Sequence, residues 1–453
     1  MRLTNAKLDR LSPEVARSGY DRNAQAVGIV HLGIGAFHRA HQAWYTDRAM
    51  DAGDRNWAIA GVSLRSADVA GQMNPQNGLY TVTERSKAGP QTRLMNAVQR
   101  VLVACQTPGA AIAALSAPET KIVSFTITEK GYCRTSDGSL DPVLAGEACV
   151  YRLLTDGLRR RRDAGLPGLT LLSCDNLADN GRQLEALMEA YLDRHDPSLH
   201  AWFEAECACP STMVDRIVPA TTDADRADLA ARIGLSDEAA VMTEPFSQWV
   251  IEDRFAGPRP RWEAVGAELV SDVRPYETAK LRMLNGAHSL LAYVGLARGH
   301  TYVHEAIADP IIRPLAERLV REEAAPTIAA APGQDLAAYA DALLARFANP
   351  ALQHRLIQIA MDGSQKIPQR WLETLAANQC RSRSCPAILA GIAAWVKHLR
   401  DANGRIDDPQ ADLLTVAVTY TDPLGALFGP GGILASNWVP TRLDRSTLHL
   451  STV

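Results

Sequence analysis

The sequence has no run of about 18 uninterrupted apolar residues and only a small excess of acidic over basic residues. The missing apolar run argues against a membrane-spanning helix, and the first residues, MRLTNAKLDRLSPE, lack the apolar core of an export signal. Lysine and arginine number 47 against 51 acidic residues, a net charge of −4, which argues against a nucleic-acid-binding face. We therefore expect a cytoplasmic protein that binds neither membranes nor nucleic acids.

Cysteine is also sparse, with eight residues scattered over the chain. Only Cys207 and Cys209, and Cys380 and Cys385, lie close together in the sequence, and neither spacing is that of a zinc knuckle. No nearby histidine completes a set of four ligands. We therefore expect reduced thiols, no disulfide framework and no structural or catalytic metal.

The chain has 453 residues, enough for two or three domains at roughly 150 residues each. Its first part alternates apolar, β-branched runs with helical spacing, and the clearest elements are strands at 27–33, 57–64, 121–128 and 169–173 and a helix at 40–50. This alternation predicts an α/β fold with a doubly wound parallel sheet. In such sheets ligands bind beyond the carboxyl ends of the strands.

The pattern changes near residue 270. Helical spacing covers 276–296, with Pro275 at a favourable first position, and further Ala- and Leu-rich helices are expected at 336–347, 353–361 and 387–400. The stretch from Asp422 onward is rich in Gly and Pro and carries no clear pattern. We therefore expect an N-terminal dinucleotide-binding domain over residues 1–270 and a mainly α-helical, substrate-binding domain over 271–453.

The segment Gly33-Ile34-Gly35-Ala36-Phe37-His38 follows a predicted strand and precedes a predicted helix. In a dinucleotide fingerprint the first glycine allows a tight turn, and the second lets the backbone approach the pyrophosphate. His38 takes the place of the third glycine, so the match is incomplete. An ordinary strand-to-helix turn is the alternative reading.

The second predicted strand ends in Ser63, Leu64 and Arg65, without the acid that reads the ribose of NAD. Arg65 could instead pair with the 2′-phosphate of NADP, or simply be exposed. These residues leave the choice between NAD and NADP open.

Lys280, Asn285 and His288 share one predicted helix. At about 100° per residue the three span an arc of roughly 140°, so they line one side of a groove rather than a narrow stripe. A lysine among apolar residues suits general-base chemistry once burial lowers its pKa, and an asparagine can donate to a developing alkoxide. An exposed lysine, a capping asparagine and a core histidine form the structural alternative.

Other polar residues follow predicted strands or interrupt helices. They are Asp175-Asn176 after LTLLSC, Asp215-Arg216 within STMVDRIVPA, the Glu129-Lys130-Gly131-Tyr132 segment, and Lys366 with Arg370 in the helical half. The first three sets are compatible with ordinary turns. The two cations could bind a carboxylate, with the arginine offering a bidentate fork.

Taken in order, eight segments resemble the polyol-specific long-chain dehydrogenases, which include mannitol 2-dehydrogenase and fructuronate reductase (D-mannonate oxidoreductase). They are GIVHLGIGAFHRAHQAWYTD, TITEKGY, LLSCDN, STMVDRIVPA, EPFSQWVIED, KLRMLNGAHS, NPALQHR and AMDGSQKIPQR. The resemblance runs from about residue 20 to about 400. It implies a Rossmann-type N-terminal domain, a mainly helical C-terminal domain and metal-independent hydride transfer.

The resemblance also implies roles for individual residues. Lys280 matches the general base, Asn176 and Asn285 match the asparagines that hold the reacting oxygen, and Glu277 matches a proton-relay glutamate. His288 and Asp215 match residues that contact the substrate, and His288 is also counted among the catalytic residues. Arg370 and Lys366 lie in a further substrate-binding segment. The cofactor site would comprise Gly33, Gly35, Ala36, Phe37, Ser63, Arg65, Glu129, Lys130 and Gly131.

Several of these segments resemble the sequences of fructuronate reductases more than those of mannitol dehydrogenases. D-mannonate and D-fructuronate are therefore the expected substrates, with NAD as the cofactor and NADP as the alternative. Mannitol 2-dehydrogenase, or a related D-arabinitol or sorbitol dehydrogenase, is the second reading. A non-catalytic dinucleotide sensor should have lost the lysine or an asparagine, and a sugar-phosphate dehydrogenase needs a phosphate cluster that we do not find. A monomer or weak oligomer is expected.

Overall fold

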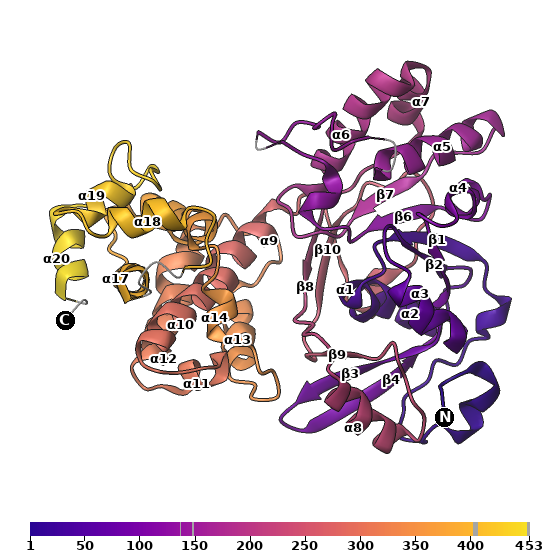
Figure 1. The fold of residues 1–453 in the computed structure, drawn as a ribbon, viewed down its shortest axis with the longest axis horizontal. Coiled ribbons are helices and arrows are strands. Elements are labelled where there is room, and N and C mark those ends of the chain that lie inside the picture. Colours follow the sequence, from indigo (N-terminus) through magenta and orange to yellow (C-terminus); the bar gives the residue numbers. More distant parts are fainter. Residues whose placement is uncertain (136, 147–148, 402–405, 451–453) are drawn as a thin grey trace. The chain divides into compact units, whose positions relative to one another are not determined.

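The computed structural model describes residues 1–135, 137–146, 149–401 and 406–450 (Figure 1). The chain divides into two compact units, Met1–Val273 and Arg274–Val453. The first unit is built on sheets and the second on helices, so the expected α/β fold with a mainly helical C-terminal part is confirmed. No helix in the described ranges is long and apolar enough to cross a membrane.

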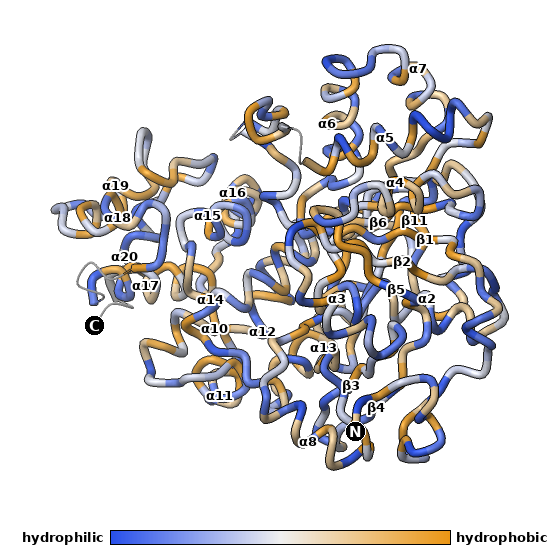
Figure 2. The backbone as a smooth tube through the Cα atoms, turned by 45° about the vertical axis from the view of Figure 1, so that its right-hand side comes forward, coloured by the Kyte–Doolittle hydropathy of each residue, from blue (hydrophilic) through white to orange (hydrophobic). Residues whose placement is uncertain are grey.

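The first unit is organised around a five-stranded sheet in the order β5-β2-β1-β6-β7, in which every neighbouring pair is parallel. The strands are β1 (Val27–Leu32), β2 (Ala58–Ser63), β5 (Val98–Val103), β6 (Ile122–Phe125) and β7 (Thr170–Ser173). Figure 2 shows how apolar residues concentrate on these strands. Near-continuous apolar runs are typical of parallel strands, because both faces of such a sheet are covered.

Successive side chains of β1 pack into different cores. Ile29 packs with Ala43 and Tyr45, which lie on a helix before β2, whereas Val30 and Leu32 pack into the core on the opposite face. The helices on the first face are α1 (Ala36–Ala40) and α2 (Gln42–Asp51); those on the second are α4 (Pro108–Ser116), α5 (Val150–Asp163), α6 (Asn180–His195) and α7 (Pro197–Glu206). The period of two along the strand thus produces two separate cores.

Two smaller mixed sheets complete the first unit, and the strand–helix alternation did not predict them. One has the order β4-β3-β9 and the other β11-β10-β8. Their strands are β3 (Tyr80–Ser86), β4 (Gly89–Met95), β8 (Thr212–Asp215), β9 (Val241–Thr243), β10 (Gln248–Glu252) and β11 (Glu268–Val270), accompanied by helices α3 (Asp68–Met73) and α8 (Asp223–Ile233). Strand β8 is antiparallel to β10.

The second unit packs around α10 (Gly286–Ala297), whose residues Leu290 and Leu291 are fully buried. The other helices are α9 (Arg274–Ala279), α11 (Val303–Ala308), α12 (Ile312–Arg318), α13 (Leu336–Phe347), α14 (Leu356–Ile359), α15 (Gly363–Ile367), α16 (Glu373–Gln379), α17 (Pro386–Asp401), α18 (Ala411–Ala417), α19 (Pro423–Phe428) and α20 (Arg442–Leu450). Three π-helical turns, Lys280–Asn285, Leu319–Ala324 and Pro368–Leu372, interrupt this α-helical pattern.

The helix predicted over 353–361 is wrong in extent, because only α14 (Leu356–Ile359) forms. The carbonyl of His354 accepts a hydrogen bond from the N–H of Val303, and the N–H of Leu356 donates to the carbonyl of Thr301. These contacts hold the start of the segment in a bridge with a remote stretch of chain. Tertiary pairing therefore overrides the helical pattern there.

All eight cysteines lie in the described ranges, and none is joined in a disulfide. Four of them, Cys133, Cys174, Cys209 and Cys385, are buried. Burial raises the pKa of Cys385 to about 12, so this thiol is an inert core residue rather than a nucleophile.

Candidate functional site

The carboxyl ends of the parallel strands share one edge of the central sheet. Strand β1 is flanked by β2 on one side and β6 on the other, so the strand order reverses direction there. Such switch points open a crevice in which doubly wound sheets bind their ligands. The structure brings the residues predicted to bind the cofactor to this edge: Ser63 and Arg65 end or follow β2, Gly33–Phe37 follow β1, and Glu129–Gly131 follow β6.

Gly33 makes a turn that only glycine tolerates. Its φ is +92°, and a Cβ there would lie 2.2 Å from the carbonyl oxygen of Thr126. Gly35 is exposed, and its N–H donates to the carbonyl of Gly33 over 2.7 Å. The chain therefore presents bare backbone at the start of α1, as the approach of a pyrophosphate requires.

His38, which replaces the third glycine, lies fully buried against the sheet. Its ring stacks on that of His31, with centroids 3.3 Å apart and an interplanar angle of 11°. Burial holds the pKa of His38 well below its usual value, so the ring is neutral. A flat imidazole pair thus occupies the position at which a glycine usually allows close packing.

The ends of β6 and β7 are held together by Asp175. Its carboxylate accepts hydrogen bonds from the N–H groups of Ile127 and Thr128, at 3.0 and 2.8 Å, and from the hydroxyl of Tyr132 at 2.8 Å. Burial raises the pKa of Asp175, while these donors act in the opposite direction. The next residue, Asn176, is exposed at the sheet edge. The sequence showed Asp175 only as a turn residue, and its bridging role was missed.

Asp215 ends β8 and is 5% exposed. Its neighbour Arg216 is buried and donates to the carbonyls of Ala40 and Glu244 and to the carboxylate of Glu84. The guanidinium also lies 5.0 Å from the ring centroid of Trp44. Arg216 is therefore a structural residue that fixes the backbone at Asp215.

In the second unit, Lys280 and Asn285 are the first and last residues of the π-helical turn between α9 and α10. The N–H of Gly286 bonds to the carbonyl of Leu281, five residues earlier. The expected angle of roughly 140° between Lys280 and Asn285 assumed a regular α-helix and is wrong, because residues five apart fall on one face of a π turn. Such single π turns occur frequently at functional sites.

His288 lies on α10, three residues after Asn285, and is 8% exposed. Its ring centroid is 4.8 Å from that of Phe347 and 5.4 Å from that of His354. Burial, together with the charges of His354, Arg346 and Arg370, holds the pKa of His288 well below its usual value. The ring is therefore neutral, and the nearby guanidinium groups of Arg346 and Arg370 further disfavour its protonation.

Arg370 lies in the π-helical turn Pro368–Leu372. Its Nη1 donates to the hydroxyl of Ser289 at 2.9 Å and approaches the carbonyl of Asn285 at 3.4 Å. Burial lowers its pKa to about 10, so the guanidinium stays charged at neutral pH. The structure thus brings Arg370 next to Asn285, at the end of the π-helical turn, and to the start of α10, where Ser289 lies. Nothing in the sequence indicated that Ser289 would accept a hydrogen bond from Arg370.

Lys366 and Glu277 complete the set of residues predicted for the second unit. The Nζ of Lys366 donates to the carbonyl of Met361 over 2.6 Å and lies 3.7 Å from the carboxylate of Asp362. The charge of Lys366 is therefore partly compensated already, which leaves Arg370 as the better anion partner. Glu277 is half-buried in α9, one turn before Lys280.

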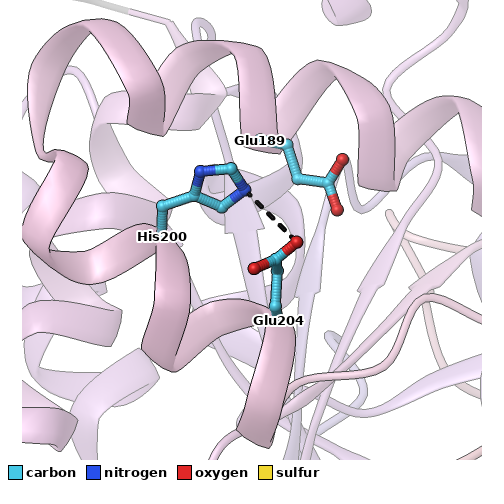
Figure 3. A group of neighbouring side chains, drawn as sticks. All are labelled: Glu189, His200 and Glu204. Carbon is cyan, nitrogen blue, oxygen red and sulfur yellow. Dashed lines mark ion pairs between the residues drawn. The ribbon is translucent and has the colours of Figure 1, made fainter.

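Within the described ranges, one group of side chains has the spacing of a metal site. Glu189 on α6 and His200 and Glu204 on α7 have ligand atoms within 4.8 Å of one another (Figure 3). His200 Nδ1 already bonds to Asp193 at 2.6 Å, and the side chain of Glu204 is 61% exposed. Contacts of His200 with the carboxylates of Asp193 and Glu204 account for the group as a polar surface cluster. None of these residues belongs to the predicted reaction site.

Two family models match the chain. The mannitol dehydrogenase Rossmann domain covers residues 27–264, and the mannitol dehydrogenase C-terminal domain covers residues 272–421. Together they span most of the sequence.

Individual proteins are similar over nearly the full length. The D-mannonate oxidoreductase of Escherichia coli is 38% identical over 95% of this chain and 93% of its own. A structure of Pseudomonas fluorescens mannitol 2-dehydrogenase, in a ternary complex with NAD and D-mannitol, has a TM-score of 0.84 at 34% identity, covering 100% of this chain and 96% of that one. A substrate-free D-sorbitol dehydrogenase has a TM-score of 0.92 at 32% identity, with 100% and 97% coverage.

Proposed function

The chain belongs to the mannitol dehydrogenase family of oxidoreductases, and within this family we propose that it interconverts D-mannonate and D-fructuronate with NAD(H). The coarser activity, oxidoreduction of a polyol or sugar acid, follows from the family. The finer choice of a carboxylated substrate rests chiefly on one observation. Arg370 is a half-buried, charged guanidinium whose Nη1 approaches the carbonyl of Asn285 at 3.4 Å, near the neutral ring of His288.

A guanidinium held partly out of water suits a carboxylate better than a hydroxyl. Its fork can donate two parallel hydrogen bonds to a carboxylate, and charge-assisted bonds are roughly twice as strong as neutral ones. The similarity to a D-mannonate oxidoreductase points in the same direction. Lys366 contributes less in this proposal, because Asp362 and the carbonyl of Met361 already engage it.

The edge at Gly33–Phe37 has the features needed to hold a dinucleotide. A side chain at Gly33 would collide with the backbone of Thr126, and Gly35 leaves its surroundings open. The backbone of Glu129, Lys130 and Gly131 follows the neighbouring strand along the same edge. We assign NAD as the cofactor from the family and from the NAD complex of the mannitol 2-dehydrogenase. NADP is the alternative, because no acid follows Ser63 and Arg65 is exposed.

In the proposed mechanism, neutral Lys280 accepts the hydroxyl proton of the substrate during oxidation and returns it during reduction. Asn176 and Asn285 donate hydrogen bonds to the oxygen as negative charge develops on it, which replaces the electrostatic role of a metal. Glu277 passes the proton from Lys280 towards solvent, and Asp215 and His288 contact the substrate hydroxyls. When bound, the nicotinamide would supply the acceptor for the hydride of the carbinol carbon.

A neutral polyol is the second candidate substrate. The solved structures similar to this chain include enzymes named for mannitol and sorbitol, and a guanidinium can also donate to hydroxyl groups. The remaining possibility, a dinucleotide sensor without activity, is disfavoured because Lys280 and both asparagines are present.

The proposal is tested with a substrate panel. Initial rates are measured for D-mannonate, D-mannitol, D-arabinitol and sorbitol, each with NAD and with NADP, and for D-fructuronate and D-fructose in reduction. We expect the highest kcat/KM for D-mannonate with NAD. A higher value for D-mannitol would replace the sugar-acid assignment with the polyol assignment, and the absence of turnover on the whole panel would favour the sensor.

A further inference from the structure

The stacked imidazoles of His31 and His38 are connected to the backbone turn at Gly33. His31 lies on β1, and both rings are fully buried. His31 Nε2 lies 2.9 Å from Thr126 Oγ1, and Thr126 Oγ1 donates to the carbonyl oxygen of Gly33 over 2.7 Å. His31 Nδ1 lies 2.8 Å from the hydroxyl of Ser124. A chain of four groups therefore ends at the turn.

The direction of this hydrogen-bond chain follows from proton counting. The hydroxyl of Thr126 has one hydrogen, and the carbonyl of Gly33 can only accept it, so Thr126 must accept from His31 Nε2. His31 therefore carries its proton on Nε2, and its bare Nδ1 accepts from Ser124. Burial lowers the pKa of His31 to about 3, so the ring is neutral at neutral pH and the hydrogen bonds alone select its tautomer.

We propose that His31 and Thr126 are positioning residues for the cofactor, and that His38 holds the ring of His31 in place by stacking. This inference rests on the proposed function, in which the Gly33–Phe37 turn binds the pyrophosphate. The carbonyl of Gly33 accepts from both Thr126 Oγ1 and the N–H of Gly35, so both of its lone pairs are engaged. An oxygen that would repel phosphate is thereby held within the protein.

The stack also accounts for the missing third glycine. The usual glycine at that position lets a helix approach the strand closely. Here the two rings, with centroids 3.3 Å apart, lie between α1 and β1, and neither ring nitrogen of His38 has a partner of good hydrogen-bond geometry among the described residues, although the side chain of Gln42 is near. We infer that the shape of the His38 ring, rather than its nitrogens, supports His31.

Two substitutions of Thr126 separate the hydroxyl from the rest of the side chain. Thr126→Val removes the hydroxyl and keeps the branched shape, whereas Thr126→Ser keeps the hydroxyl and loses the methyl group. Because one neutral hydrogen bond contributes modestly, we expect Thr126→Val to raise the Kd for NADH about 3- to 10-fold in a fluorescence titration. The KM for NAD should rise similarly while kcat stays within about 2-fold, and Thr126→Ser should bind like the wild type.

A matched control is Thr120→Val. Thr120 is fully buried in the same unit, and its hydroxyl donates to the carbonyl of Ala114 over 2.8 Å, so this variant also loses a threonine–carbonyl hydrogen bond. Both valine variants should lower the melting temperature, but only Thr126→Val should weaken cofactor binding. Equal weakening by the two, or wild-type binding by Thr126→Val, would overturn the inference.

The stacking role is tested independently at His38. His38→Phe keeps a flat ring and should retain NADH affinity within about 2-fold, whereas His38→Ala should weaken it. Loss of affinity in both variants would show that the nitrogens matter and would contradict the inferred role of the ring shape. A wild-type protein that binds neither NADH nor NADPH would overturn the proposed function itself, and the positioning roles with it.

Discussion

Arg370 donates a hydrogen bond to the hydroxyl of Ser289 over 2.9 Å, although 81 residues separate them in the sequence. Ser289 is the residue after His288 on α10, and Asn285 lies one turn earlier. This contact joins the π-helical turn of Arg370 to the helix that holds His288 and directly follows Asn285. It makes Arg370 the most informative residue for the identity of the substrate.

The first prediction concerns substrate charge. Arg370→Ala should reduce kcat/KM for D-mannonate about 10- to 150-fold more than for D-mannitol, because a charge-assisted bidentate contact is lost only with the acid. Ser289→Ala is the matched control, since it removes the same protein–protein hydrogen bond and leaves the cation. That control should affect both substrates alike. Equal losses for both substrates in Arg370→Ala would contradict the carboxylate contact.

The second prediction concerns the general base. Lys280→Ala should abolish oxidation near neutral pH, because the general base is lost. The Kd for NADH should remain close to that of the wild type, because the residues proposed to bind the cofactor follow β1, β2 and β6 and do not include Lys280. Small exogenous amines should restore part of the rate. Lys397→Ala, at an exposed lysine that pairs with Asp401 over 3.5 Å on α17, serves as the control and should be fully active. A turnover number of Lys280→Ala within a few-fold of the wild type would contradict the assignment of Lys280 as the general base.

The third prediction concerns metals. Prolonged dialysis against a chelator should leave kcat unchanged, because Lys280 and the two asparagines perform the chemistry in the proposed mechanism. His200→Ala should likewise be active, since its group on α6 and α7 lies outside the proposed site. An activity that falls on dialysis and returns with added zinc would refute metal independence.

The fourth prediction concerns the choice of cofactor. Arg65 is exposed after β2, where it can reach a phosphate on the ribose but has no corresponding partner on NAD. Arg65→Ala should therefore lower kcat/KM with NADP about 10-fold and leave the value with NAD within about 2-fold. Steady-state rates with both cofactors measure this ratio. An unchanged ratio would exclude Arg65 as a reader of the 2′-phosphate.

The fifth prediction concerns stability against pH. Glu323 is buried and accepts hydrogen bonds from the N–H groups of Ala387 and Ile388 at the start of α17. Burial raises its pKa to about 7 from an ordinary 4.5, so the folded state holds this proton more tightly than the unfolded chain. Stability from Glu323 is therefore greatest below about pH 4.5 and is lost as the pH rises through 7, by at most about 3 kcal/mol.

Thermal unfolding between pH 5 and pH 8 measures this effect. Glu323→Gln should show a smaller fall in melting temperature across the interval than the wild type, whatever its absolute stability. Glu322→Gln is the control, because the neighbouring carboxylate is 67% exposed and pairs only with Arg318 among the described ion pairs. Identical pH profiles for the wild type and Glu323→Gln would contradict the raised pKa.

The five strands of the central sheet show how far local patterns reach. The predicted strands at 27–33, 57–64, 121–128 and 169–173 correspond to β1, β2, β6 and β7, and the family resemblance is confirmed. Apolar runs of this kind mark strands buried on both faces, and Gly33 marks a turn through its backbone alone. The fold class was therefore predictable without any long-range information.

The π-helical turn between Lys280 and Asn285 shows where such patterns end. Side-chain spacing does not distinguish a π turn from an α turn over six residues, so the sequence implied a wide arc for these two residues. Asp175 and Ser289 were likewise unrecognisable, because their partners lie 43 to 81 positions away in the chain. Only the packing of distant segments reveals which polar residues hold one another in place through hydrogen bonds.

Four strands of the central sheet, the glycine turn after β1 and the family were predictable from the sequence, because these depend on side-chain periodicity, on glycine conformation and on short contiguous motifs. The tertiary structure alone decided that Asp175 bridges two strand ends, that Arg370 meets Ser289, and that a pair of histidines replaces the third glycine. Those outcomes depend on which distant segments are brought within hydrogen-bond or stacking distance. Burial then decides which of the groups is charged.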